Sequence, residues 1–252
     1  MTPLLDGKTA LITGGGTGIG RAIALEFAKA GAKIAVTYRT HTPDDGFRAQ
    51  VEEFSASPLV AHALDATSED EVVATLQAVH RAVGELDVLV NNVGGLVQRS
   101  PVADMDFGLW RQVMALNVDS TFLMTHHALP ILNDGGRIIN IASLAGRTGG
   151  HPGATAYATA KAAIFGFTRG LAKELAPSCI TVNALAPGFI EDTPFHDTFT
   201  TAASKAATVQ SIPAGRAGKP ADVAGAALWL AGGLSEFVTG TVIDINGGQY
   251  FG

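Results

Sequence analysis

Short apolar runs alternate along the chain with longer stretches in which apolar residues recur every three or four positions. The apolar runs predict about seven strands, at 8–13, 33–38, 59–64, 87–91, 136–142, 180–186 and 241–245. The longer stretches predict helices, most clearly at 21–30, from 68 onward, and at 106–129, 155–175 and 220–232. Strands alternating with helices favour a parallel sheet with helices on both faces. We therefore predict an α/β fold: a single doubly wound, Rossmann-type domain spanning residues 1–252.

Two stretches fit this pattern poorly. Residues 43–58 are polar and only loosely periodic, so they form the weakest predicted helix. Residues 189–213 form a long polar, Ala-rich excursion. An irregular connection of that length is uncommon inside a compact domain unless it covers a site, so we expect it to act as a lid.

Composition and charge narrow the classes of function. Hydrophobic residues make up 47% of the chain, which supports a large core, and its net charge of −6 comes without any basic stripe, which argues against a nucleic-acid partner. No long apolar run or leader-like amino terminus is present, so we expect a cytoplasmic protein without a membrane partner. Cys179 is the only cysteine and stands in an apolar run, so we expect a packed thiol rather than a nucleophile. No metal site is expected.

The first strand ends abruptly in Gly14-Gly-Gly-Thr-Gly-Ile-Gly20, which leads into a helix. Such a junction directs backbone N–H groups and the positive end of a helix dipole at one point, and its glycines admit a pyrophosphate. A Walker loop is excluded because no Gly-Lys-Ser/Thr follows, and the strict Gly-x-Gly-x-x-Gly spacing cannot end at Gly20. The context favours a dinucleotide over a plain tight turn.

Arg39 follows the second strand, where the adenosine ribose of a dinucleotide would lie. No acidic residue able to bind the ribose 2′-hydroxyl occurs before Asp44, whereas Arg39 could pair with a 2′-phosphate. We therefore expect NADP(H) to be preferred over NAD(H), although a solvated arginine at a strand end is the alternative.

Further polar residues follow other predicted strands or stand in helices. Asp65 and Ala66 follow the third strand, and Asp65 suits either an adenine amino group or a helix cap. Asn117 occupies the middle of a helix, where a side chain that competes with backbone hydrogen bonds is costly. Tyr157 and Lys161 stand one helical turn apart, so an ammonium lies beside a phenol and favours its ionised form. A phenol tuned in this way suits general acid–base chemistry.

The residues described above and their order along the chain resemble the short-chain dehydrogenase/reductase family, and most of all its 3-oxoacyl-[acyl-carrier-protein] reductase-like subgroup. The motifs that carry the resemblance cover nearly the whole chain: Thr13 to Gly20, Asp65, Asn91 to Gly94, Asn117, Ser143, Tyr157, Lys161 and Pro187-Gly188. Val93 departs from the usual Ala, and Thr193 stands one residue further from Pro187 than in many relatives.

The resemblance implies a role for each matching residue. Tyr157 would be the general acid–base, Ser143 would bind the substrate oxygen, Lys161 would bind the nicotinamide ribose and lower the pKa of Tyr157, and Asn117 would hold a relay water. The cofactor-binding residues would be Gly14, Thr17, Gly18, Ile19, Arg39, Asp65, Ala66, Asn91, Gly94, Tyr157, Lys161, Pro187, Gly188, Ile190 and Thr193.

The resemblance therefore implies reduction of a ketone, such as a 3-oxoacyl, sugar or other small carbonyl substrate, by NADP(H). Two alternatives remain open: an NAD(H)-dependent alcohol or sugar dehydrogenase, and a nucleotide-binding protein without catalysis. The resemblance also implies a homo-oligomer, a tetramer or dimer, built on the helices that contain Asn117 and Tyr157.

Overall fold

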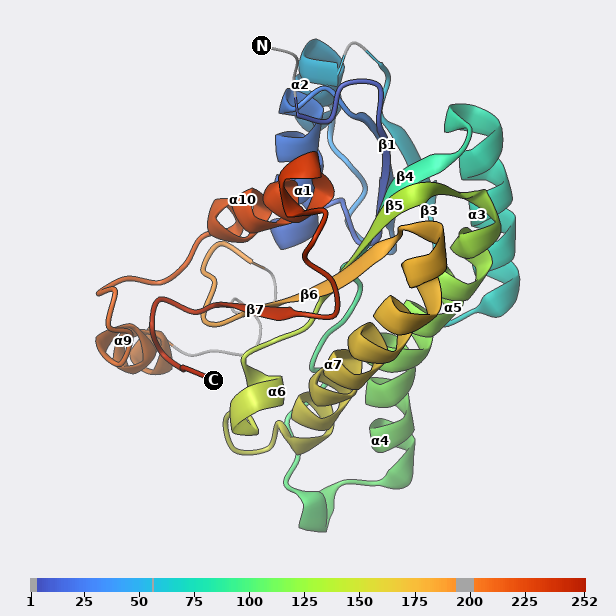
Figure 1. Cartoon of the computed structure of the whole chain (residues 1–252). Coiled ribbons are helices and arrows are strands. Elements are labelled where there is room, and N and C mark those ends of the chain that lie inside the picture. Colours follow the sequence, from blue (N-terminus) through green and yellow to red (C-terminus); the bar gives the residue numbers. More distant parts are fainter. Residues whose placement is uncertain (1–3, 56, 194–201) are drawn as a thin grey trace.

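Seven parallel strands form one sheet in the order β3-β2-β1-β4-β5-β6-β7 (Figure 1). The computed structural model describes residues 4–55, 57–193 and 202–252. The strands are β1 (Thr9–Ile12), β2 (Lys33–Tyr38), β3 (Val60–Ala63), β4 (Leu86–Asn91), β5 (Leu132–Ile141), β6 (Thr181–Pro187) and β7 (Val242–Ile245). Strand order reverses between β1 and β4, and a doubly wound sheet binds its ligands at the carboxyl ends of the strands beside such a reversal. The predicted parallel sheet is confirmed.

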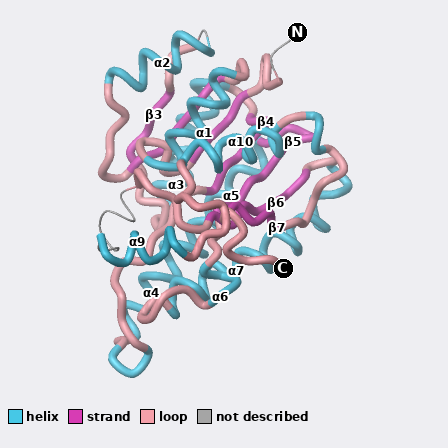
Figure 2. The backbone as a smooth tube through the Cα atoms, turned by 90° about the vertical axis from the view of Figure 1, so that its left-hand side faces the viewer, coloured by secondary structure: helices cyan, strands magenta, loops and turns pink. Residues whose placement is uncertain are grey.

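Helices cover both faces of this sheet (Figures 1 and 2). The longer ones are α1 (Gly18–Lys29), α2 (Asp45–Ser55), α3 (Glu69–Val83), α4 (Phe107–Met114), α5 (Ser120–Ala128), α7 (Thr155–Leu175), α9 (Ala202–Gln210) and α10 (Pro220–Ala231). Helices α1, α2 and α10 share one hydrophobic core with the sheet, and α3, α5 and α7 share the other. The site therefore sits on a scaffold packed from two sides.

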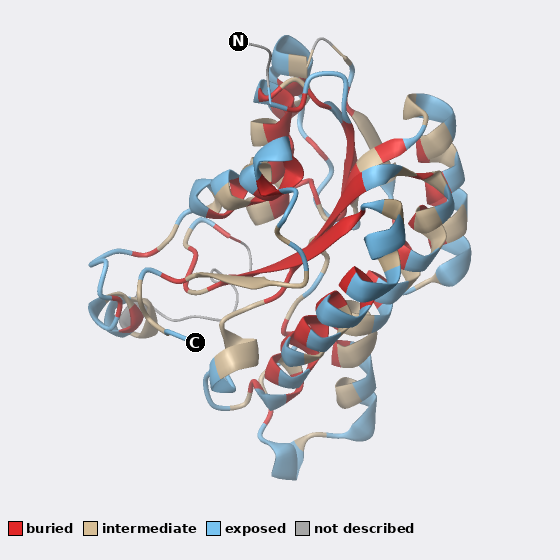
Figure 3. Ribbon diagram, viewed as in Figure 1, coloured by how far each residue is buried: buried red, intermediate tan, exposed pale blue. Residues whose placement is uncertain are grey.

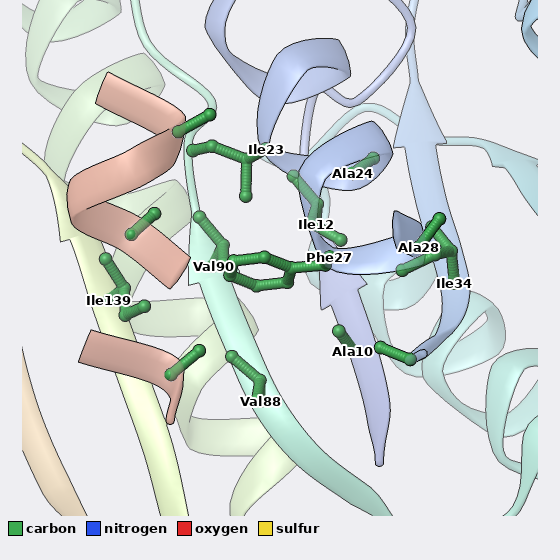
Figure 4. Close-up of a cluster of buried hydrophobic side chains, with 14 of the residues drawn as sticks. Ala10, Ile12, Ile23, Ala24, Phe27, Ala28, Ile34, Val88, Val90 and Ile139 are labelled. Carbon is green, nitrogen blue, oxygen red and sulfur yellow. The ribbon is translucent and has the colours of Figure 1, made fainter. Parts of the chain in front are cut away.

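The two cores explain why the central strands are continuously apolar. Every residue of β1 and of β6 is buried, because helices lie above and below them (Figure 3). Phe27 of α1 is fully buried among side chains that include Ile12, Ile34 and Val90 (Figure 4). This packing fixes α1 directly after β1 and so fixes the glycine turn between them.

Three predictions about individual stretches are corrected by the structure. The helix predicted at 106–129 is interrupted by a π-helical turn, η2 (Ala115–Asp119), which separates α4 from α5. Part of the 189–213 excursion is regular, because it contains α9, whereas residues 194–201 lie outside the described residues. Cys179 is exposed rather than packed, since it takes a left-handed turn conformation just before β6.

Within the weakly predicted segment at 43–58, residues Asp45–Ser55 form α2. Only Phe47 and Val51 of this helix are buried, so its sequence is mostly polar, and this explains why it was the weakest predicted helix. Asp44 accepts a hydrogen bond from the Phe47 N–H at 2.8 Å and so caps the first turn. Among the described residues, none of the helices has the length and apolar character needed to cross a membrane.

Candidate active site

A cleft of about 670 Å³ opens at the carboxyl ends of the strands. Most of the residues predicted to bind cofactor or substrate line it: Gly14, Thr17, Gly18, Ile19, Arg39, Asp65, Ala66, Gly94, Ser143, Tyr157, Lys161, Pro187, Gly188, Ile190 and Thr193. Asn91 and Asn117 do not line it. Residues far apart in the sequence therefore meet at one site, as expected for loops that follow parallel strands.

The glycine turn after β1 has no space for side chains on its inner side. A Cβ at Gly16 would collide with the carbonyl oxygen of His41, and one at Gly20 would collide with that of Gly14. Gly14 itself has a φ of +63°, in the left-handed region that favours glycine. The turn leads into α1, and Thr17 and Gly18 at the start of this helix line the cleft. This arrangement suits a bound pyrophosphate.

Asn92 holds the glycine turn against β4, a role that the sequence analysis missed. Its amide group donates hydrogen bonds to the carbonyl oxygens of Thr13 at 2.9 Å and Gly14 at 3.2 Å. Its backbone N–H donates to the Thr13 hydroxyl at 2.9 Å. Asn92 also lines the cleft. The doubled Asn-Asn was the available signal, but only strand alternation decides which of the two faces the cleft.

Asn91, the residue predicted to bind cofactor, is turned the other way. Its side chain is buried and donates hydrogen bonds to the Thr125 hydroxyl and to the side-chain oxygen of Asn140, both at 2.9 Å. It therefore ties β4 to β5 and α5. Its side chain therefore does not face the cleft, and a cofactor contact by Asn91 stays a prediction.

An arginine and a carboxylate are paired at one end of the cleft. At the end formed by the loops after β2 and β3, Arg39 and Asp65 form an ion pair with 2.9 Å between nitrogen and oxygen. Asp65 also accepts a hydrogen bond from the Thr67 hydroxyl, which together with Arg39 holds the pKa of the carboxyl below its usual value. Arg39 remains largely exposed, with 65% of its side chain accessible, so its guanidinium is open to a further anion.

Tyr157 and Lys161 lie in the first turns of α7, and Ser143 faces them from the loop after β5. Ser143 and Tyr157 form a side-chain hydrogen bond. The Lys161 ammonium is buried, lies 5.8 Å from the centre of the Tyr157 ring and donates to the carbonyl oxygen of Ile141 at 2.8 Å. The structure thus brings together three of the four residues predicted to be catalytic.

Burial sets the protonation of this group. Loss of water around the phenol raises the pKa of Tyr157, and the hydrogen bond with Ser143 only partly opposes that rise. Burial lowers the pKa of Lys161 to about 8. The expected lowering of the Tyr157 pKa by Lys161 is therefore not found, because desolvation dominates both groups. At neutral pH the phenol is protonated and the amine is mostly charged.

Asn117 stands behind the cleft wall instead of in it. It is fully buried in the π-helical turn η2, and its side chain is hydrogen-bonded to the backbone of Gly95 and Val113. A Cβ on the neighbouring Gly94 would lie 2.6 Å from the Asn117 side-chain oxygen and 2.7 Å from the Lys161 ammonium. Asn117 therefore supports the loop against which Lys161 packs.

A short helix, α6 (Ala145–Thr148), supports Ser143 from the other side. Its Arg147 donates hydrogen bonds to both carboxylate oxygens of Asp244 in β7, at 3.3 and 3.2 Å, and its guanidinium lies over the Phe165 ring of α7. Helix α6 is seated directly on α7, and the two lie side by side in Figure 1. These contacts hold the Ser143 loop between α7 and the last strand.

The residues of the cleft fit a nicotinamide dinucleotide. The Cβ-free turn accommodates a pyrophosphate at the start of α1, Arg39 is open to a phosphate, and Lys161 lines the same cleft. Among residues 4–55, 57–193 and 202–252, no group of three or more His, Cys, Asp or Glu side chains is arranged to hold a metal ion. The fold and the site define an NAD(P)-dependent oxidoreductase that acts on CH–OH or C=O groups.

Comparison with known proteins supports this class. The family model described as enoyl-(acyl carrier protein) reductase matches residues 14–249. The chain is 38% identical to a 3-oxoacyl-[acyl-carrier-protein] reductase of Aquifex aeolicus and 36% identical to that of Vibrio harveyi, covering 98% of both chains in each case. A short-chain dehydrogenase/reductase from Brucella melitensis, titled a glucose/ribitol dehydrogenase, superimposes with a TM-score of 0.91 at 32% identity over 100% of both chains. The chain belongs to the short-chain dehydrogenase/reductase family.

Proposed function

We propose that the protein reduces a ketone to a secondary alcohol with NADP(H), using Tyr157 as the proton donor. The observation that carries this proposal is the Ser143–Tyr157 hydrogen bond beside a buried Lys161, in the same cleft as the glycine turn. Tyr157 carries its proton at neutral pH, since burial raises a phenol pKa that is already high, and the neighbouring Lys161 ammonium favours transfer of that proton. The 3-oxoacyl-[acyl-carrier-protein] reductases at 36–38% identity support a ketone as substrate.

The chain's own groups divide the work as follows. The hydroxyl of Ser143 donates a hydrogen bond to the substrate carbonyl oxygen and stabilises the negative charge that develops there. Tyr157 delivers its proton to the same oxygen. The Lys161 ammonium lies close enough to compensate the phenolate that remains. When bound, NADPH supplies the hydride that reduces the carbonyl carbon.

Cofactor contacts follow the walls of the cleft. Gly14, Thr17, Gly18 and Ile19 hold the pyrophosphate, whereas Arg39 binds the 2′-phosphate and Asp65 and Ala66 border the adenine. Around the nicotinamide we place Gly94, Pro187, Gly188, Ile190 and Thr193. Asn117 positions the loop after β4 through its hydrogen bonds with Gly95. We also propose that Asn117 holds a water that relays protons to the site.

A second candidate is oxidation of an alcohol or sugar with NAD(H). The Brucella melitensis structure titled a glucose/ribitol dehydrogenase supports it. Arg39 favours the NADP(H) reductase, because no carboxylate able to bind a ribose 2′-hydroxyl takes its place at the end of β2. We further propose a homo-oligomer, consistent with the exposed Phe107 and Phe122 rings on α4 and α5.

The test is the substitution Tyr157→Phe, which keeps the ring and removes the proton. We expect turnover with a panel of ketones to fall by about 100-fold to 10,000-fold, the usual contribution of a general acid. NADPH affinity, measured by fluorescence titration, should stay within a few-fold. Tyr250→Phe, at a tyrosine outside the cleft, is the matched control. A Tyr157→Phe enzyme that kept most of its activity would overturn the proposal, and a wild type that bound NADPH without oxidising it would indicate a non-catalytic protein.

A further inference from the structure

Two loops close on each other at the end of the cleft opposite Arg39. The Ser100 N–H donates to the Gly153 carbonyl oxygen at 2.9 Å, joining the loop after β4 to the loop after β5. The Arg99 guanidinium donates to the carbonyl oxygen of Pro152 at 3.4 Å. A Cβ at Gly153 would lie only 3.2 Å from that of Arg99, so the two backbones are in close contact. Arg99 is thereby held against Pro152 and Gly153, which come five and four residues before Tyr157 in the chain.

Arg99 and His151 both line this part of the cleft, one from each loop. Many other described residues of the cleft wall have apolar or uncharged side chains, among them Leu96, Leu144, Ala145, Thr148, Ala154, Phe189, Thr208 and Gln249. Asp65 is the one carboxylate among the described residues of the cleft wall, and it is paired with Arg39. This end of the cleft therefore carries a positive charge without a matching carboxylate from its described wall.

The donors of Arg99 are mostly unused. A guanidinium has five N–H donors, and in the described part of the chain Arg99 makes one long hydrogen bond, to a backbone carbonyl. The fork of a guanidinium matches the two oxygens of a carboxylate and binds them in a bidentate manner. A half-buried arginine in a largely apolar cleft is thus available to a ligand of opposite charge.

We propose that Arg99, assisted by His151, binds a carboxylate of the substrate, so that the preferred substrates are keto acids whose ketone lies at Tyr157. This inference rests on the reductase function proposed above. A hydride and a proton add across the C=O bond, and the carboxylate passes through the reaction unchanged. Pro152 comes five residues before Tyr157, which limits their separation to at most about 18 Å, so the test uses keto acids with different spacings between carboxylate and ketone.

The test compares 4-oxopentanoate and 5-oxohexanoate with their uncharged methyl esters. We expect wild-type kcat/KM to favour the acids by at least about tenfold, the usual range for a charge-assisted hydrogen bond. Arg99→Gln should lower the acid-to-ester ratio by at least about tenfold, Arg99→Lys should restore part of it, and His151→Asn should lower it less. Arg81→Gln, at an exposed arginine outside the cleft, should leave the ratio at its wild-type value.

A binding measurement keeps the test independent of turnover. With saturating NADPH, hexanoate should raise the Tm of the wild type and hexanamide should not, and Arg99→Gln should remove the difference. If acids and esters are reduced equally well and Arg99→Gln leaves their ratio unchanged, the carboxylate site is overturned while the reductase function stands. If the wild type binds NADPH but reduces neither these compounds nor a wider ketone panel, both proposals fail.

Discussion

The side chain of Asn117 forms two hydrogen bonds with the backbone of Gly95: its oxygen accepts from the Gly95 N–H at 3.0 Å, and its amide group donates to the Gly95 carbonyl oxygen at 2.8 Å. A third bond runs to the Val113 carbonyl oxygen at 2.9 Å within the same helix. The side-chain amide thus makes the pair of hydrogen bonds with Gly95 that the backbone of an adjacent strand would otherwise make. It fixes the loop after β4 to the π-helical turn between α4 and α5.

Asn117→Leu should therefore destabilise the protein and slow catalysis together. The substitution leaves the Gly95 N–H and C=O without partners, at a cost of about 2–4 kcal/mol in the free energy of unfolding. Turnover should fall because Gly94 packs against Lys161. Urea denaturation and kcat measure the two effects. Ser120→Ala, which removes a single hydrogen bond to Leu116 in the same helix, is the control and should cost about 1 kcal/mol or less.

Gly94 permits no side chain, so Gly94→Ala should impair catalysis specifically. The added methyl group would lie 2.6 Å from the Asn117 oxygen and 2.7 Å from the Lys161 ammonium, and Lys161 is held by Ile141. To relieve these contacts, Asn117 or Lys161 must move, and a displacement of about 1 Å costs about 100-fold in rate when it moves a catalytic group. We expect that loss in kcat/KM for ketone reduction. Wild-type activity in this variant would show that Lys161 has room to move without consequence.

Gly166→Ala is the matched glycine replacement, with the opposite expectation. Gly166 lies in the middle of α7, and a Cβ there meets no atom within 4 Å. Alanine favours the helix over glycine by about 0.5–1 kcal/mol, so the variant should be more stable by that amount. Kinetic constants should match those of the wild type. A loss of stability in urea denaturation would contradict the open space seen at this position.

The sequence predicts the sheet well because its strands are buried on both faces. The run at 33–38 coincides with β2, and the other six strands agree with their predicted ranges to within a few residues. The helices α2 and α9 were missed or weakly predicted, since a helix that buries few side chains has few apolar residues to mark it in the sequence. Regular burial, rather than length, determined which elements could be predicted.

The site was predictable as a set of residues but not as a set of contacts. Asn91 and Asn92 are adjacent, and strand alternation sends one into the core and the other toward the cleft. Asn117 was identified as unusual by residue type alone, whereas its partner Gly95 is 22 positions away in the sequence. The pKa of Tyr157 depends on how much water reaches the phenol. These three features require the packed structure.

Replacing Arg39 by Asp should separate the two cofactors. Arg39 is largely exposed and paired with Asp65, so its guanidinium is positioned to share a phosphate at the cleft rim. Loss of the charge should weaken NADPH binding by about 10-fold to 100-fold and NADH binding far less. Fluorescence titration with both cofactors measures the difference, with Arg81→Asp as a control outside the cleft. Equal losses for NADPH and NADH would rule out 2′-phosphate recognition by Arg39.

Lys161 should reduce stability at neutral pH while serving catalysis. Burial lowers its pKa from 10.5 to about 8. Below pH 8 both folded and unfolded states carry the charge, and the folded state bears the full cost of burying it. Between pH 8 and 10.5 the unfolded state binds more protons, so the penalty is relieved as the pH rises.

Lys161→Met should therefore be inactive yet more stable than the wild type at pH 7, by about 1–3 kcal/mol, and its advantage should shrink as the pH rises from 8 toward 10.5. The lower end of that range allows for the lost hydrogen bond to Ile141. Urea denaturation of the cofactor-free protein at pH 7, 8, 9 and 10 measures the difference. Lys173→Met, at an exposed lysine in the last turn of α7, should show no such advantage at pH 7. If Lys161→Met is less stable than the wild type at pH 7, the buried ammonium is compensated in the folded state, and the low pKa of Lys161 does not hold.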